Sequence, residues 1–156
     1  MLIVMLEDYS PLIIQRRAEL EAAGHRVVVA TTITKGYEVY GCYCGEPGII
    51  TFDFSMPRQA GEIKLGNTLS LIQRAFLEFS TGQSRLYPVA ASSLAEARLQ
   101  QKKAGCLLVI SDVRSYGSEV IACAERLPLI STRMHQLQML AEGVPNLICS
   151  QPTIHC

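Results

Sequence analysis

The chain has 156 residues, of which 49% are apolar and only 18% are charged. These values suit one compact domain with a sizeable core and exclude a disordered chain or a coiled coil. With 14 basic and 14 acidic side chains the formal net charge is zero, which argues against nucleic acid or an anionic membrane surface as a direct partner. The apolar runs are too short to span a membrane, and the acidic start MLIVMLEDY does not resemble a signal peptide, so we expect a cytoplasmic protein.

The first half of the chain alternates short apolar runs with helical patterns. The expected elements are a strand at 2–6, a helix from Ser10 to Gly24, a strand at 26–31, an ambiguous segment at 33–47 and a strand at 48–53. The pattern of the helix predicts that one of its sides is formed by Ile13, Ile14, Ala18 and Ala22. Cys42 and Cys44, in the ambiguous segment, form too weak a metal motif and are expected to be free thiols.

The same alternation continues through the second half. The expected elements are a helix at 68–80, a strand at 85–91, a helix from Ser93 to near Gly105, a strand at 106–111, a helix at about 117–126, a strand at 128–132, a helix at 133–142 and a strand at 146–149. Pro88 predicts either that the 85–91 strand lies at an edge of the sheet or that the strand starts at the proline, because proline cannot donate to a ladder of hydrogen bonds.

Strands that are apolar throughout and alternate with helices indicate a doubly wound α/β fold, a mostly parallel sheet with helices on both faces. We expect one such domain over residues 1–156. The chain has three aspartates, and each of them, Asp8, Asp53 and Asp112, directly follows an apolar run. Functional sites of parallel sheets lie at the carboxyl ends of the strands, and all three aspartates would be placed there.

Glu7 and Asp8 would meet Asp53 at one edge of this sheet. Clustered carboxylates repel one another, so a cation among them is expected. Oxygen ligands of this kind suit Mg²⁺, which takes one or two carboxylates and often a phosphate. The chemistry this favours is phosphoryl transfer to a carboxylate, or hydrolysis at it.

Two segments resemble the receiver domains of CheY-like response regulators, which have a flavodoxin-like fold. LIVMLEDYSPLIIQRRAELEAAGHRVVVA is similar to the opening of that family, and ITFDFSMPRQAG matches its phosphoacceptor pattern D-x-x-M-P-x-x-x-G. The separation of Glu7 and Asp53, 53 − 7 = 46 residues, is close to the family's. The resemblance implies that Asp53 accepts phosphate from a histidine kinase. It also implies that Mg²⁺ is held by Glu7, Asp8, Asp53 and the backbone carbonyl of Ser55.

The second half departs from the family's pattern. A receiver has a hydroxyl side chain after its fourth strand, a position that Ser92 or Ser93 would fill. It also has a lysine after its fifth strand, where this chain carries Asp112. None of the four lysines falls at the end of an expected strand. The coupling of phosphate to a signalling surface should therefore be weaker than in a typical receiver.

A second alignment of the chain with the family is also open. CLLVISDVRSYG resembles a receiver's third strand and acceptor loop, which would make Asp112 the acceptor. Residues of about 33–90 would then hold inserted or partly duplicated material, and the sequence Ile72-Gln73-Arg74 repeats Ile14-Gln15-Arg16. The lysine is missing in this alignment too.

Three functions follow from these patterns. The first is a stand-alone receiver-like signalling domain that accepts phosphate with Mg²⁺ and acts through protein contacts. Its partner would be a histidine kinase or other signalling protein, and this function is also compatible with a homodimer. The second is a pseudo-receiver that binds partners without phosphorylation. The third is a small Mg²⁺-dependent phosphohydrolase, although an acceptor or interaction domain is favoured over an enzyme.

Overall fold

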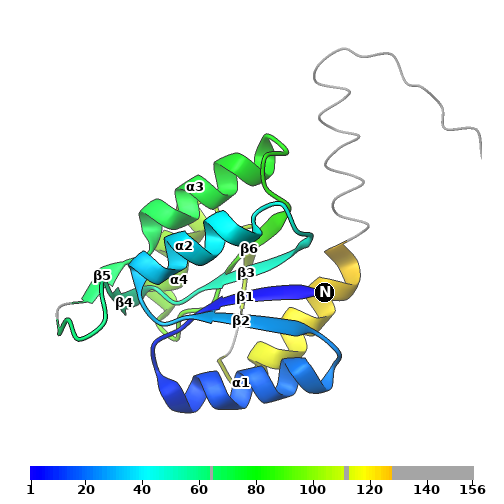
Figure 1. Cartoon of the computed structure of the whole chain (residues 1–156), viewed down its shortest axis with the longest axis horizontal. Helices are drawn as coiled ribbons and strands as arrows, with labels where there is room; N and C mark the ends of the chain where they lie inside the picture. The colour runs from blue at the N-terminus through cyan, green and yellow to red at the C-terminus, as the bar shows by residue number, and fades with distance from the viewer. Residues whose placement is uncertain (64, 111–112, 128–156) are drawn as a thin grey trace, which may run out of the picture. The chain divides into compact units, whose positions relative to one another are not determined.

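A computed structural model describes residues 1–63, 65–110 and 113–127 (Figure 1). Met1–Glu125 form one compact unit. A second unit, Arg126–Cys156, lies almost entirely outside the described residues, and so do the strands expected at 128–132 and 146–149 and the helix expected at 133–142. None of the helices in the described part is both long and apolar enough to cross a membrane.

The compact unit is built on a parallel sheet of five strands in the order β2-β1-β3-β6-β7. These strands are β1 (Leu2–Leu6), β2 (Arg26–Ala30), β3 (Gly48–Phe52), β6 (Leu86–Ala90) and β7 (Leu108–Val109). The inner strands β1, β3 and β6 are buried along their whole length, as their uninterrupted apolar sequences predict. The doubly wound fold expected from the sequence is therefore confirmed.

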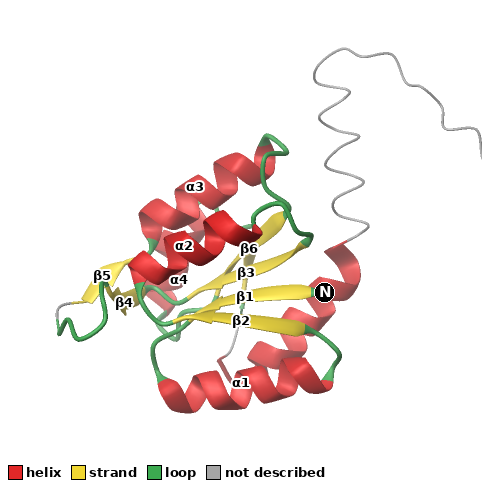
Figure 2. Ribbon diagram, viewed as in Figure 1, coloured by secondary structure: helices red, strands yellow, loops and turns green. Residues whose placement is uncertain are grey.

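Helices cover both faces of this sheet (Figure 2). They are α1 (Ser10–Ala22), α2 (Ile33–Tyr43), α3 (Leu69–Ser80) and α4 (Ala95–Ala104), followed by a short 3-10 turn η1 (Val113–Ser115) and a helix over residues 116–127. The main core lies between the sheet and the helices α2 and α3, where Tyr40, Phe52 and Ile72 are fully buried. The other face is covered by α1 and the helix that starts at Tyr116.

A hairpin lies between β3 and α3. Its strands β4 (Ser55–Pro57) and β5 (Leu65–Asn67) pair antiparallel and form a separate two-stranded sheet. The hairpin is anchored to α2 through the Thr34 N–H, which donates to the carbonyl of Arg58 at 3.0 Å. It falls within the range of about 33–90 in which the sequence predicts additional material, and its origin by insertion or duplication stays a prediction.

Two local predictions are wrong. Pro88 lies in the middle of β6, an inner strand, and not at an edge or a strand start. Its carbonyl accepts the Leu107 N–H at 2.9 Å, so the backbone edge of Pro88 that lacks an N–H faces β7. Because β7 begins only at Leu108, no hydrogen bond of the ladder is lost. In α1, the apolar side that the sequence predicts is not the buried side: Ile14 is 71% exposed, and the buried residues are Arg16 and Leu20.

Candidate functional site

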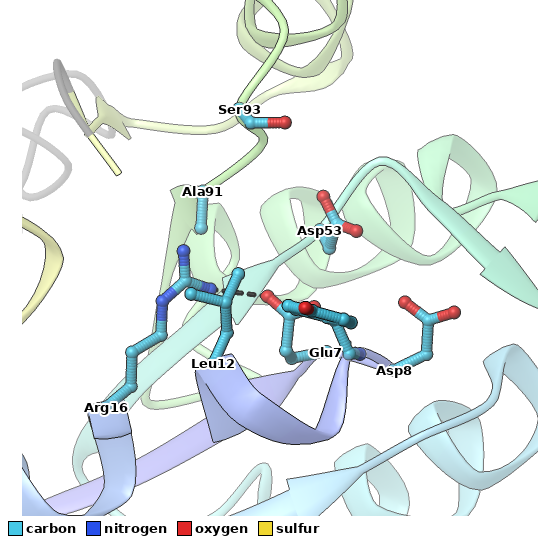
Figure 3. Close-up of a pocket in the computed structure, with 8 residues that line it drawn as sticks. Glu7, Asp8, Leu12, Arg16, Asp53, Ala91 and Ser93 are labelled. Carbon is cyan, nitrogen blue, oxygen red and sulfur yellow. Dashed lines mark hydrogen bonds and ion pairs between the residues drawn. The ribbon is translucent and has the colours of Figure 1, made fainter. Parts of the chain in front are cut away.

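Three carboxylates gather at the carboxyl ends of two neighbouring strands. Glu7 and Asp8 follow β1, and Asp53 follows β3, which pairs with β1 up to Leu6 opposite Phe52. Each of the three side chains offers an oxygen atom, and these oxygens lie within 4.8 Å of one another. Figure 3 shows the three carboxylates around one pocket. The sequence placed these residues at one sheet edge, and the structure brings them together.

Backbone hydrogen bonds fix where the two chain segments leave the sheet. The Glu7 N–H donates to the carbonyl of Ala30 at 3.1 Å, and the Asp53 N–H donates to the carbonyl of Leu6 at 3.0 Å. Both residues therefore continue the ladder by one position beyond their strands. The backbone positions of Glu7 and Asp53 are therefore fixed by the sheet, as a precise site requires.

The Glu7 side chain is buried and fully engaged. Its Oε1 accepts the Tyr9 N–H at 3.1 Å, and its Oε2 accepts Nη1 of Arg16 at 2.5 Å. The side chains of Arg16 and Glu7 are only 3% and 4% exposed. Glu7 thus belongs to a buried ion pair inside the acidic pocket, and Arg16 lines that pocket with it.

Arg16 is held from its other side by an aromatic ring. The guanidinium carbon lies 4.1 Å from the centre of the Tyr116 ring, a favourable arrangement for a cation over a π face. The Tyr116 hydroxyl lies 2.7 Å from Oγ1 of Thr51 in β3, and both residues are 1% exposed. Glu7, Arg16, Tyr116 and Thr51 therefore form one buried chain of contacts.

Asp53 sits in a loop that its neighbours hold in place. Its Oδ1 accepts the Phe54 N–H at 2.8 Å, and its backbone carbonyl accepts Oγ1 of Thr68 at 2.7 Å. The Thr68 N–H also donates to the carbonyl of Phe54 at 3.1 Å. These bonds orient the Asp53 carboxylate while leaving the side chain partly accessible from the pocket.

Burial is the main influence on the acidity of the pocket. It raises the pKa of Glu7 and of Asp53 above their ordinary values, because the ionised forms lose water. The Tyr9 and Phe54 N–H groups and the Arg16 charge act in the opposite direction. Repulsion among the carboxylates raises both pKa values further. Any cation that enters the pocket should therefore stabilise the ionised carboxylates.

Ser92 and Ser93, the two expected hydroxyl residues, follow β6 at the same edge of the sheet. Ser92 is buried, and hydrogen bonding from its side chain lowers the pKa of Asp53. Ser93 lines the pocket (Figure 3). Ser55 begins the hairpin two residues after Asp53. Asp112, the expected rival acceptor, lies outside the described residues.

Two residues of the pocket's surroundings, Arg16 and Tyr116, were not predicted from the sequence. A signal for Arg16 was present, because it lies on the same side of the helix as Ile13 and Leu20, at spacings of three and four residues. A cation on a buried helical stripe is rarely left without a partner. No comparable signal marked Tyr116, whose role depends on tertiary packing.

The donor set fits a divalent cation of the Mg²⁺ class. The three carboxylates are the one group of metal-ligand type that the described residues bring together; oxygen donors of this kind are the ones that Mg²⁺ prefers. Cys42 and Cys44 are free thiols and join no such group in the described part of the chain. Glu7 fits less simply than Asp8 and Asp53, because both of its oxygens already accept hydrogen bonds.

Comparison with solved structures identifies the fold. A response regulator receiver domain protein from Clostridium thermocellum superposes with a TM-score of 0.61 at 15% identity, over 83% of this chain and 98% of that one. The non-phosphorylated HemR receiver domain of Leptospira biflexa gives 0.57 at 21% identity, over 81% and 92%. NtrX from Brucella abortus in complex with ATP gives 0.66 at 16% identity, over 89% of this chain and 29% of that chain.

The sheet order and the acidic edge define the class as a flavodoxin-like α/β domain with a carboxylate site. Within that class the chain has the fold of CheY-like response-regulator receiver domains. No protein-family model matches the chain, and no curated protein matches it in sequence. The solved structures therefore establish the fold, and the chemistry rests on the residues of the pocket.

Proposed function

We propose that the chain is a receiver-type signalling domain that accepts a phosphoryl group on Asp53 with the help of Mg²⁺. The observation that carries this proposal is the convergence of Glu7, Asp8 and Asp53, with carboxylate oxygens within 4.8 Å of one another, on a receiver fold. Asp53 occupies the acceptor position of the segment DFSMPRQAG, at the carboxyl end of the central strand β3.

In the proposed reaction, a carboxylate oxygen of Asp53 attacks the phosphorus of a phosphohistidine. A P–O bond forms, the P–N bond breaks, and its electron pair leaves with the imidazole nitrogen, which takes up a proton. Asp53 must be ionised to attack; the Phe54 N–H and the Arg16 charge favour that form against the effect of burial. The Ser92 hydroxyl, whose hydrogen bonding lowers the pKa of Asp53, would donate to the new phosphoryl oxygens.

The residues that would hold Mg²⁺ are Asp8, Asp53 and the backbone carbonyl of Ser55, with Glu7 in the same carboxylate group. The ion would neutralise the charge that accumulates on the phosphoryl oxygens. A histidine kinase or another signalling protein as partner, a homodimer, the cytoplasmic location and the absence of direct nucleic-acid or membrane binding stay predictions from the sequence.

The test is covalent modification. Beryllofluoride or acetyl phosphate with Mg²⁺ should give a one-to-one adduct that intact-protein mass spectrometry detects for acetyl phosphate and ¹⁹F NMR detects for beryllofluoride. Asp53→Asn should abolish the adduct, because the amide is not a nucleophile, whereas Asp112→Asn should leave it intact.

The alternatives give different results in the same experiment. Loss of the adduct in Asp112→Asn but not in Asp53→Asn would show that the second alignment of the chain is correct. A folded wild-type chain that forms no adduct would favour the phosphorylation-independent pseudo-receiver. Repeated turnover of acetyl phosphate at a rate far above the decay of an acyl phosphate would favour the phosphohydrolase.

A further inference from the structure

The acidic pocket contains a cation of its own. Arg16 enters it from the second turn of α1, and its Nη1 lies 2.5 Å from Oε2 of Glu7 (Figure 3). Exposed ion pairs on the same helix look different: Arg17 bonds Glu21 at 2.8 Å with side chains 52% and 45% exposed. Arg16 and Glu7 are 3% and 4% exposed, so water screens their attraction far less.

The guanidinium is held in place on several sides. Nη1 is bound to Glu7, the guanidinium carbon lies over the Tyr116 ring at 4.1 Å, and that ring is anchored through its hydroxyl to Thr51. The Nε atom of Arg16 is buried and has no hydrogen-bond partner among the described residues. A buried donor without a partner is costly, so this position is maintained by the ion pair and the aromatic contact.

This arrangement changes the charge that a metal ion would meet. Three carboxylates alone would present three negative charges, but Arg16 cancels one of them. Because Oε1 of Glu7 accepts the Tyr9 N–H and Oε2 accepts a hydrogen bond from Arg16, a metal ligated by Glu7 would have to share an oxygen with one of these donors, close to the guanidinium charge. The Arg16 charge also acts on Asp53, whose pKa it lowers.

We propose that Arg16 is the resident counter-ion of the acidic pocket: it occupies Glu7, restricts a divalent cation to Asp8 and Asp53, and lowers the affinity for that cation. The divalent site itself rests on the proposed function. Arg16 is a positioning residue here, because it acts through Glu7 and through its charge and does not ligate the metal.

The experiment measures Mn²⁺ binding to the whole chain by electron paramagnetic resonance of the free ion, with Mg²⁺ as competitor. Arg16→Met removes the charge and keeps most of the apolar stem. The affinity of Arg16→Met for Mn²⁺ should rise about tenfold or more, the effect of removing one nearby unit charge from a partly desolvated site. Arg17→Met, the matched control one residue along α1, should bind Mn²⁺ as the wild type does.

A double variant tests the role of Glu7 separately. Glu7→Gln with Arg16→Met removes a charge pair without changing the net charge, and it leaves no unpaired ion in the interior. This double variant should bind Mn²⁺ within about threefold of the wild type. A loss of about tenfold or more would overturn the proposal, because it would make Glu7 a ligand. The double variant also keeps the test available if Arg16→Met alone fails to fold.

The outcomes separate this inference from the proposed function. Metal affinity is measured without a phosphoryl donor, so tighter binding by Arg16→Met supports the counter-ion even if Asp53 forms no adduct. A normal adduct on Asp53, together with unchanged or weaker Mn²⁺ binding by Arg16→Met, overturns the counter-ion and leaves the proposed function standing. Absence of binding in the wild type and in every variant overturns the counter-ion as well.

Discussion

The hydrogen bond between the hydroxyls of Tyr116 and Thr51 connects the pocket to the centre of the sheet. The two oxygens are 2.7 Å apart, and both residues are 1% exposed. Burial raises the pKa of Tyr116 to about 12, so the phenol stays neutral at ordinary pH and the bond persists. Since the Arg16 guanidinium lies over the Tyr116 ring, this bond fixes the position of the ring that Arg16 contacts.

Tyr116→Phe should lower the free energy of unfolding by about 1–2 kcal/mol, because it leaves the Thr51 hydroxyl buried without its partner. The ring that supports Arg16 is kept. Thr51→Val should cost a similar amount, and the double variant should be less destabilised than the sum of the two by about 1 kcal/mol. Urea denaturation measures all three.

Tyr9→Phe is the control for this cycle. Tyr9 is 59% exposed, and removing its hydroxyl should change the free energy of unfolding by less than about 0.5 kcal/mol. If the losses from Tyr116→Phe and Thr51→Val simply added, the two hydroxyls would not be coupled, and the contact between the ring and the sheet would rest on packing alone.

At the scale of elements, the close approach of β1 and β3 determines where the carboxylates meet. β3 begins at Gly48, which pairs with Leu2 at the start of β1, and five residues later the same two strands bring Asp53 beside Glu7. A Cβ atom on Gly48 would lie 2.4 Å from the backbone carbonyl oxygen of Leu2. Glycine is therefore required there by the neighbouring backbone.

Gly48→Ala should lower the free energy of unfolding by about 1–3 kcal/mol, because the backbone of β1 must move to admit the methyl group. The matched control is Gly41→Ala in α2, where a Cβ would meet nothing within 4 Å. That change should raise the free energy of unfolding by about 0.5–1 kcal/mol through helix propensity. Thermal unfolding of the two variants should therefore shift in opposite directions.

Part of the site and of the fold around it could be predicted from the sequence. The apolar strands and the carboxylates after them were predictable, because a parallel sheet gathers the ends of its strands at one edge. The segment at 33–47 was ambiguous by composition, yet Thr32 caps α2 by accepting the Lys35 N–H at 3.1 Å, a local signal that the sequence contains.

Other features depend on contacts between distant segments. Arg16 reaches Glu7 only because α1 packs its buried side onto the pocket, and its support comes from Tyr116 in a much later helix. Pro88 is tolerated in an inner strand because β7 starts only at Leu108. Neither the pairing of a buried charge nor the length of a neighbouring strand is a property of a local sequence pattern.

For the molecule as a whole, the charges balance to zero, but they are not evenly placed. Most of the ion pairs found in the described residues are exposed, such as Arg17–Glu21 and Lys35–Glu38, and these contribute little to stability. The pocket concentrates three carboxylates against one arginine. Its electrostatics should therefore influence the pH dependence of folding more than the surface pairs do.

Asp53→Asn should reveal this influence in the stability of the protein without Mg²⁺. The pKa of Asp53 is raised in the folded state, so between its unfolded value of about 3.9 and its folded value the folded chain binds more protons than the unfolded chain. The free energy of unfolding contributed by Asp53 therefore falls as pH rises through this window and stays lower above it. Asparagine, which does not ionise, avoids that loss.

The variant should accordingly be more stable than the wild type at pH ~8, and the difference should shrink as the pH falls and vanish at about pH 2–3, where Asp53 is protonated in both states. Urea denaturation at a series of pH values measures it. Glu62→Gln, which removes an equal charge from the exposed end of the β4–β5 hairpin, should not reproduce the profile. A difference that is independent of pH would show that the introduced amide stabilises the fold by its hydrogen bonds, because only relief of the buried charge disappears when the carboxyl is protonated.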